Sequence, residues 1–303
     1  LRADGSVITW GNSFYGGGSS SVATQLDGTL DVTQVFSTSY AFAALRANGS
    51  VVTWGDLTYG GNSSTVATQL DGTIDVTRVF STWFAFAALR ADGSVITWGD
   101  SSFGGDSSAV AAQINGTIDV RQVFSTEWGA FAALRVDGSV VTWGGSSRGG
   151  DSGAVAAQLD GTIDVTQVFS TRNAFAALRT DGSVVTWGDA LSGGNSSAVA
   201  AQLAGSIDVT RVFANHYAFA ALRADGSLVT WGEPSYGGNS SAVASKLDGT
   251  IDVTQVFSTR EAFAALRADG SVVTWGNPSS GGDSSLVAAK LDGTIDVTQV
   301  FST

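Results

Sequence analysis

The chain consists of seven copies of one unit that repeats about every 44 residues. The tripeptide Thr-Trp-Gly marks every copy, and its tryptophans are Trp10, Trp54, Trp98, Trp143, Trp187, Trp231 and Trp275. A fixed period of this length is typical of propellers, solenoids and other repeat arrays. Positions that are the same in all copies build the unit, so positions that differ between copies are free to serve another purpose.

One repeat, residues 74–117, contains four segments with the composition of short strands. The first is rich in β-branched side chains, and the turn Ala91-Asp92-Gly93 between the second and third is a strong hairpin signal. A glycine-rich loop precedes the fourth segment. The four expected strands are 74–80, 85–90, 94–98 and 109–114. Four such strands per repeat predict an all-β fold, a seven-bladed β-propeller of four-stranded antiparallel blades.

The blades follow from the period, and together they make one propeller domain over residues 1–303. Their expected limits are 30–73, 74–117, 118–162, 163–206, 207–250, 251–294 and a closing blade of 295–303 plus 1–29. Six residues equivalent to Ser39 through Ala44 are missing from the closing blade. The chain also begins with Leu1 and contains no Met. We interpret it as a fragment of a longer repetitive chain.

Composition narrows the class of partner. The net charge is −12, but the 27 acidic residues are spread over the repeated turns and do not form one patch. A nucleic-acid partner needs clustered Lys and Arg, so we expect none. Without an apolar run of about 18 residues, we expect no membrane insertion. An acidic, Lys-poor chain rich in Ser, Thr and Gly is compatible with an extracellular or cell-surface location.

Strings such as Ala-Leu-Arg-Ala-Asp-Gly-Ser-Val-Val-Thr-Trp-Gly resemble the repeat of the regulator-of-chromosome-condensation propeller family. The resemblance covers the whole chain and implies the propeller fold. The His that usually precedes the Ala-Leu pair is replaced by Ala, as at Ala85, and the Gly before it by Thr or Asn, as at Thr82 and Asn215. These departures place the chain among divergent, bacterial-type members. They weaken any transfer of nucleotide exchange on a small GTPase. The family also includes secreted inhibitors that clamp an enzyme with one propeller face.

Three repeated features have structural interpretations. The Thr-Trp-Gly tryptophans could form an aromatic binding ring, but a Trp at one position in every copy favours packing between blades. The arginine of each Leu-Arg pair could line an anion channel or could pair across strands with an aspartate, as Arg90 with Asp75. The Asp-Gly strings match no calcium-binding loop, so we interpret them as turns and expect no metal.

Catalysis is not expected. The chain has no Cys, its single His216 has no repeated acid beside it, and no nucleophile-elbow motif occurs. We therefore expect neither an enzyme nor a cofactor.

The repeats differ mainly in two loops. One joins the first strand to the second, and the other follows Thr-Trp-Gly; all five Tyr of the chain lie in these loops. In a four-stranded meander both connections lie on the same face. Exposed aromatic and Arg side chains are typical of interface hot spots. The predicted partner-binding face comprises Tyr15, Tyr40, Tyr59, Trp83, Phe84, Phe103, Trp128, Arg172, His216, Tyr217, Tyr236 and Arg260.

The sequence thus favours a non-enzymatic binding module in a large secreted or cell-surface repeat protein. Its expected partner is a protein or a glycan, bound through one propeller face. The alternative is a structural subunit or spacer that self-assembles in an extracellular fibre or array. An enzyme or a small-GTPase exchange factor is the remote alternative. Drift of surface loops would also make them differ between copies, although drift does not favour Trp and Tyr.

Overall fold

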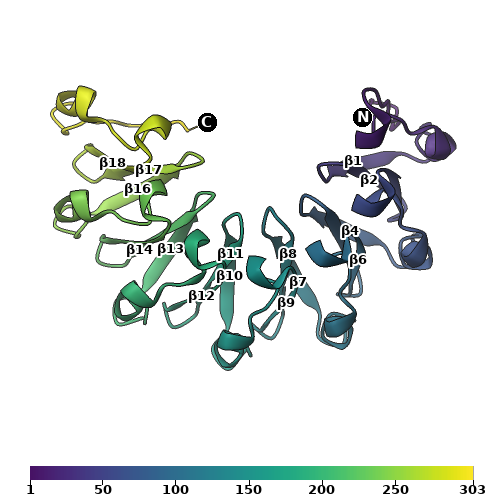
Figure 1. The fold of residues 1–303 in the computed structure, drawn as a ribbon, viewed down its shortest axis with the longest axis horizontal. Helices are drawn as coiled ribbons and strands as arrows, with labels where there is room; N and C mark the ends of the chain where they lie inside the picture. The colour runs from purple at the N-terminus through teal and green to yellow at the C-terminus, as the bar shows by residue number, and fades with distance from the viewer. Residues whose placement is uncertain (303) are drawn as a thin grey trace. The chain divides into compact units, whose positions relative to one another are not determined.

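The computed structural model describes residues 1–302 and shows an all-β, propeller-like fold. The described residues contain 18 strands in six antiparallel sheets of three strands each (Figure 1). The chain divides into two compact units, one formed by Leu1–Asp151 and the other from Ser152 onward, and each unit contains three sheets.

The strands recur at the same place in every repeat. In the first unit they are β1 (Val32–Ser37), β2 (Ala41–Arg46), β3 (Val51–Gly55), β4 (Val76–Ser81), β5 (Ala85–Arg90), β6 (Val95–Gly99), β7 (Val120–Ser125), β8 (Ala130–Arg135) and β9 (Val140–Gly144). In the second unit they are β10 (Val165–Ser170), β11 (Ala174–Arg179), β12 (Val184–Gly188), β13 (Val209–Ala214), β14 (Ala218–Arg223), β15 (Leu228–Gly232), β16 (Val253–Ser258), β17 (Ala262–Arg267) and β18 (Val272–Gly276).

An Asp-Gly-Ser turn, or Asn-Gly-Ser in the first sheet, fixes the register of the second hairpin in each sheet. Both the amide and the hydroxyl of Ser94 donate to Asp92 Oδ1, at 3.1 and 2.6 Å, and Gly93 has φ +74°. A residue other than glycine is strained in that left-handed conformation. The turn aligns β5 with β6 so that Phe86 lies opposite Trp98. These residues therefore fold as the sequence predicts.

The predicted fourth strand is wrong. In its place each repeat has a 3-10 helix, and residues 109–114 fall in η6 (Ser108–Gln113) and the residue after it. Val110 packs against the core and Ile114 is buried, whereas Ala112 between them is exposed. Burial at i and i+4 is a helical pattern; a strand would bury alternate residues. The equivalent helices are η2 (Ser20–Gln25), η4 (Ser64–Gln69), η8 (Gly153–Gln158), η10 (Ser197–Gln202), η12 (Ser241–Lys246) and η14 (Ser285–Lys290).

The predicted count of seven blades is also wrong for the described residues. The segments assigned to the closing blade, 1–29 and 295–302, contain no strand; Thr303 lies outside the described residues. The physical reason is the missing middle strand. Without it, an edge segment such as residues 7–11 has no ladder of backbone partners on that side. Closure of a ring by the two ends stays a prediction.

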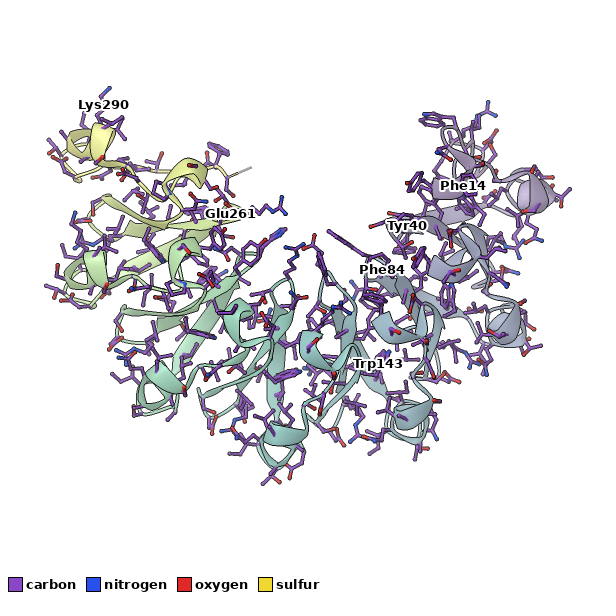
Figure 2. All side chains as sticks on the ribbon, in the orientation of Figure 1. Phe14, Tyr40, Phe84, Trp143, Glu261 and Lys290 are labelled. Carbon is purple, nitrogen blue, oxygen red and sulfur yellow. The ribbon has the colours of Figure 1, made fainter. Side chains whose placement is uncertain are left out.

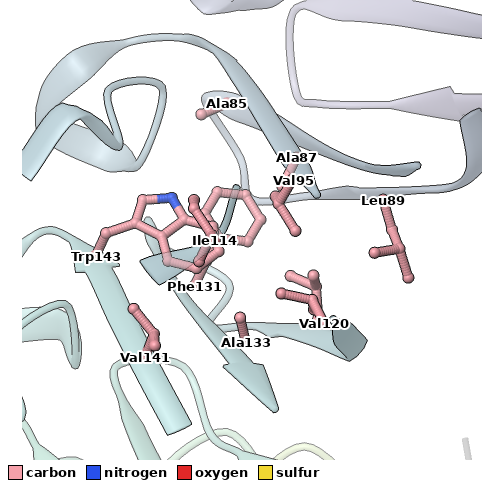
Figure 3. Packing of buried hydrophobic residues seen from close by; sticks show 11 residues of the cluster. Ala85, Ala87, Leu89, Val95, Ile114, Val120, Phe131, Ala133, Val141 and Trp143 are labelled. Carbon is pink, nitrogen blue, oxygen red and sulfur yellow. The ribbon is translucent and has the colours of Figure 1, made fainter. Parts of the chain in front are cut away.

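Neighbouring sheets within a unit pack face to face around small and large apolar side chains (Figure 3). Ala85, Ala87 and Val95 of one sheet meet Phe131 and Trp143 of the next, and all five side chains are buried. The alanines leave the space that the two rings fill. Trp98, Trp231 and Trp275 pack between two sheets in the same way, as the sequence predicts, whereas Trp10 is 83% exposed.

The predicted pairing of Arg90 with Asp75 is wrong. Arg90 forms its ion pair with Asp92 of the adjoining turn, with 3.7 Å between Nη2 and Oδ2. Val76 lies directly opposite Arg90 in the β4–β5 ladder. Asp75 is one residue away, so its side chain projects toward the other face of the sheet. The same arginine–turn pair recurs, for example between Arg179 and Asp181 at 3.3 Å.

Candidate interaction surface

A buried polar side chain ties together the two variable loops of a repeat. Thr82 Oγ1 accepts hydrogen bonds from the amides of Phe84 and Ala85, at 3.3 and 3.1 Å, and lies 3.3 Å from the carbonyl oxygen of Phe103, to which it donates. Phe84 lies in the first loop and Phe103 in the second. The hydroxyl therefore holds both loops at the same end of the sheet, as the sequence predicts for a meander.

Asn215 performs the same role in a repeat of the second unit. Its Oδ1 accepts from the amides of Tyr217 and Ala218, both at 2.8 Å, and its Nδ2 donates to the carbonyl of Tyr236 at 2.7 Å. The side chain is 6% exposed. Thr or Asn at this position thus supplies both an acceptor and a donor, which glycine could not do.

The loop after Thr-Trp-Gly is a short helix, and in five of the seven described helices the side chain of the preceding residue caps its first turn. Asp100 Oδ1 accepts from the amide of Ser102 at 2.8 Å, and Gly104 ends the helix with φ +99°. The cap fixes where the last helical side chain, Phe103, is presented. These helices are η1 (Ser13–Tyr15), η3 (Leu57–Gly61), η5 (Ser101–Phe103), η7 (Ser146–Arg148), η9 (Ala190–Gly194), η11 (Pro234–Tyr236) and η13 (Pro278–Ser280).

Seven of the predicted residues form one contiguous group in the first unit. We call it the aromatic cluster: Tyr15, Tyr40, Tyr59, Trp83, Phe84, Phe103 and Trp128. Tyr40 and Phe84, both labelled in Figure 2, stack with 5.9 Å between ring centroids. Tyr15 lies 5.3 Å from Tyr40, and Phe103 lies 4.4 Å from Phe84. The rings come alternately from the two kinds of loop, so four successive repeats, with the limits 1–29, 30–73, 74–117 and 118–162, contribute to one surface.

Arg148 extends the aromatic cluster, although it was not among the predicted site residues. Its guanidinium carbon lies 4.5 Å from the Phe103 ring centroid and 5.9 Å from that of Trp128. Trp128 in turn lies 5.2 Å from Trp83. A Cβ on Gly129 would come within 2.6 Å of Phe103, so this glycine makes room for the ring. The sequence alone could have identified Arg148, because Arg148 stands five residues after Trp143, as Phe103 stands five residues after Trp98 in the preceding repeat.

The expectation that these side chains are largely exposed is wrong for most of the aromatic cluster. Tyr15 is 53% exposed, but the other six residues are partly buried. Each ring covers part of its neighbour, which explains the difference. By contrast, Phe14 and Leu57 in the same loops are 75% and 71% exposed, and neither belongs to the cluster. The cluster is therefore an ordered surface and not a set of separate exposed rings.

The second unit brings together the remaining predicted residues in a more polar group. Arg172 donates from Nη1 to the hydroxyl of Tyr217 at 2.8 Å, and its guanidinium lies 5.8 Å from that ring. Tyr217 also packs against Tyr236, with centroids 4.7 Å apart, and lies 6.1 Å from His216. Arg260 is exposed and joins this group through its backbone, whose carbonyl accepts from the amide of His216 at 3.2 Å.

The carboxylates with shifted pKa values belong to turns. The amide and hydroxyl of Thr73 hold the pKa of Asp71 below its ordinary value. At Asp92 burial acts to raise the pKa, but hydrogen bonds from Ser94 outweigh it and the pKa is lowered. An Asx turn is formed when a side-chain oxygen accepts such hydrogen bonds, and the same bonds favour the ionised form of an aspartate. These shifts therefore point to turn formation.

Two negative observations apply to residues 1–302. No group of three or more His, Asp or Glu side chains in this part of the chain is arranged to hold a metal ion. None of its helices has both the length and the apolar character needed to span a membrane.

Comparisons with known proteins find similar folds but no similar sequence. No protein-family model matches the chain, and no curated protein matches it. The ectodomain of the Physcomitrella patens receptor kinase CR4 is 14% identical, with a TM-score of 0.45 over 82% of this chain and 62% of that one. The chain thus spans less than two thirds of that ectodomain.

Two further structures are from Saccharomyces cerevisiae and Arabidopsis thaliana. Prp20p from the yeast is 16% identical, with a TM-score of 0.44 over 81% of this chain and 72% of that one. The ectodomain of the Arabidopsis receptor kinase ACR4 is 14% identical, with a TM-score of 0.43 over 83% of this chain and 81% of that one. Yeast RCC1 (Prp20) is thus among the structures similar to this chain, whose repeat resembles that of the regulator-of-chromosome-condensation family.

Proposed function

We propose that the chain is a non-enzymatic interaction module that binds a partner protein through the loop face of its first unit. The aromatic cluster is the observation that carries this proposal. Large aromatic side chains with an arginine beside them are enriched in interface hot spots, because they bury much area at little entropic cost. A partner would remove the remaining exposed ring area of the cluster from water.

The order of the cluster supports binding over drift. Thr82 fixes the two loops that present Phe84 and Phe103, and Asp100 caps the helix that carries Phe103. The rings are therefore held in place before a partner arrives, which lowers the entropic cost of association.

A selection from a random peptide library tests this proposal. The intact chain and its variant Trp83→Ser/Trp128→Ser are each offered the same displayed 12-residue peptides, with Arg211→Gln as a surface control. We expect peptides enriched on the wild-type chain to bind the control equally well and the double variant at least tenfold more weakly. Equal binding to the double variant would show that the aromatic cluster is not the binding surface.

The setting we propose is a large secreted or cell-surface repeat protein, since the chain is acidic, repetitive and poor in Lys. Sedimentation of the same samples separates this module from the alternative, a self-assembling spacer. A discrete binding module stays monomeric at micromolar concentrations, whereas a fibre subunit associates with increasing concentration. A glycan array with the same three proteins tests whether the partner is a saccharide instead.

A further inference from the structure

Three residues at equivalent positions of three successive repeats form a basic row in the second unit. They are Arg172, His216 and Arg260, each 44 residues from the next. The amide of Arg172 donates to the carbonyl of His216 at 2.9 Å, and the amide of His216 donates to that of Arg260 at 3.2 Å. Loops joined in this way lie about 5 Å apart, the spacing of hydrogen-bonded strands. The row therefore places two guanidinium groups and an imidazole on adjacent loops.

The equivalent positions of the first unit serve as an internal comparison. They are Ser39, Trp83 and Glu127, and the same backbone bonds connect them, at 3.0 and 2.9 Å. The connecting backbone is thus common to both units, while the side chains differ. A row with two arginines is a property of these three repeats and is not required by the fold.

Most other arginines of the second unit have a partner in the fold. Arg179, Arg223 and Arg267 pair with the aspartates of their own turns at 3.2 to 3.7 Å. Arg260 is exposed and forms no ion pair with any of residues 1–302. The neighbouring Glu261 carboxylate accepts instead from Asn277 Nδ2 at 2.7 Å and from Ser280 Oγ at 3.1 Å.

Arg172 and Arg260 lie on the two loops that border the His216 loop, and their guanidinium charges repel one another, as like charges do when placed opposite on neighbouring strands. An anion placed along the row would relieve that repulsion and accept hydrogen bonds from the side chains. Arginine suits this task because its planar fork of N–H donors matches a carboxylate. The hydrogen bond from Arg172 to the Tyr217 hydroxyl orients one of these forks in advance.

We infer that the basic row binds an acidic peptide segment of a partner, with successive carboxylates on Arg172, His216 and Arg260. This goes beyond the proposed function, since the row needs no part of the aromatic cluster. An extended peptide advances about 3.3 Å per residue, so a short run of Glu or Asp can follow three adjacent loops.

Binding of fluorescein-labelled hexaglutamate to the intact chain, followed by anisotropy, tests this inference. We expect Arg260→Gln to weaken binding about tenfold, as the loss of one charge-assisted contact does. Arg172→Gln combined with Arg260→Gln should abolish measurable binding. Arg211→Gln is the matched control, because it removes the same charge from an exposed residue of β13 in the same unit; it should change binding by less than twofold.

Several outcomes would overturn the inference. Equal weakening by Arg211→Gln would show attraction by net charge alone, and absence of binding at 50 mM salt would show that the row is not a site. Tighter, row-dependent binding of a sulfated hexasaccharide would assign the row to a glycan. The exposed side chain of Arg260 forms no ion pair with the described residues, so Arg260→Gln should fold normally. This single variant still tests the inference if a variant of Arg172 unfolds. Trp83→Ser/Trp128→Ser should bind hexaglutamate normally, which separates this test from that of the proposed function.

Discussion

The indole of Trp98 donates its Nε1 hydrogen to the carbonyl of Gly60, 38 residues earlier, at 3.1 Å. The same bond joins Trp54 to Gly16 and Trp231 to Gly193, each at 3.0 Å. The glycine belongs to the loop of the preceding repeat. Each bond therefore links two neighbouring repeats, and it explains why the repeat needs Trp and not another large apolar residue.

Removal of a repeated Trp should destabilise the fold where the ring is buried and not where it is exposed. We expect Trp98→Ala to lower the free energy of unfolding by about 3–5 kcal/mol, as large-to-small core changes do. Trp10→Ala is the control, since Trp10 is 83% exposed; its cost should stay under about 0.5 kcal/mol. Urea unfolding measures both values. Similar costs for the two variants would mean that Trp10 is buried in solution.

The glycines that cover the buried rings give a second test. At Gly60 a Cβ would come within 2.6 Å of Phe86 Cδ2, and φ is +106°. Gly281 has a similar φ of +96°, but nothing lies within 4 Å of its Cβ position. Both alanine variants carry left-handed strain of about 1–2 kcal/mol. Only Gly60→Ala adds crowding, which should lower the free energy of unfolding by a further ~1–3 kcal/mol. Urea unfolding of both variants measures the difference. Equal costs would argue against the close packing of Gly60 on Phe86.

The aromatic cluster should contribute modestly to stability. Trp83 and Trp128 lie 5.2 Å apart, so a double-mutant cycle with alanine should give a coupling energy of about 0.5–1.5 kcal/mol. Phe14→Ala, at a ring 75% exposed, should cost less than about 0.5 kcal/mol. A coupling energy near zero would restore the view that these rings are independent surface residues.

Acid should destabilise the protein through its turns. The folded-state pKa of Asp71 and of Asp248 is lowered below 3.8 by hydrogen bonds from Thr73 and Thr250. Stability from such groups is complete above their unfolded pKa and is lost as the pH falls through the folded one. The urea midpoint should therefore change little from this source between pH 7 and about 5 and should fall below about pH 4.

Asparagine variants of these turn residues provide the control for the acid effect. Asn115 occupies the same place in one natural repeat, and its Oδ1 accepts from the amide of Thr117 at 2.9 Å. Asp71→Asn/Asp248→Asn should thus keep the turns and lose part of the acid sensitivity. An unchanged dependence of the urea midpoint on pH would assign acid unfolding to other groups.

The sequence by itself determined the repeat, its three strands, its turns and the burial of its internal tryptophans. These features depend on contacts within about 44 residues, and the repeats supply seven examples of each. The Asp92–Ser94 turn and the alanines of β5 are instances, because local hydrogen bonding and side-chain size are enough to specify them. The sequence also predicted that both variable loops lie at one end of the sheet.

Only the tertiary structure decided the remaining points. Ile114 follows a 3-10 helix and is buried in the core between two sheets, a conformation that depends on where the next repeat packs and not on strand composition. Arg90 pairs with Asp92 because the β4–β5 register turns Asp75 away. The rings of the aromatic cluster that touch from different loops are 19 to 45 residues apart in sequence, so their mutual burial is fixed by the stacking of the repeats that present them.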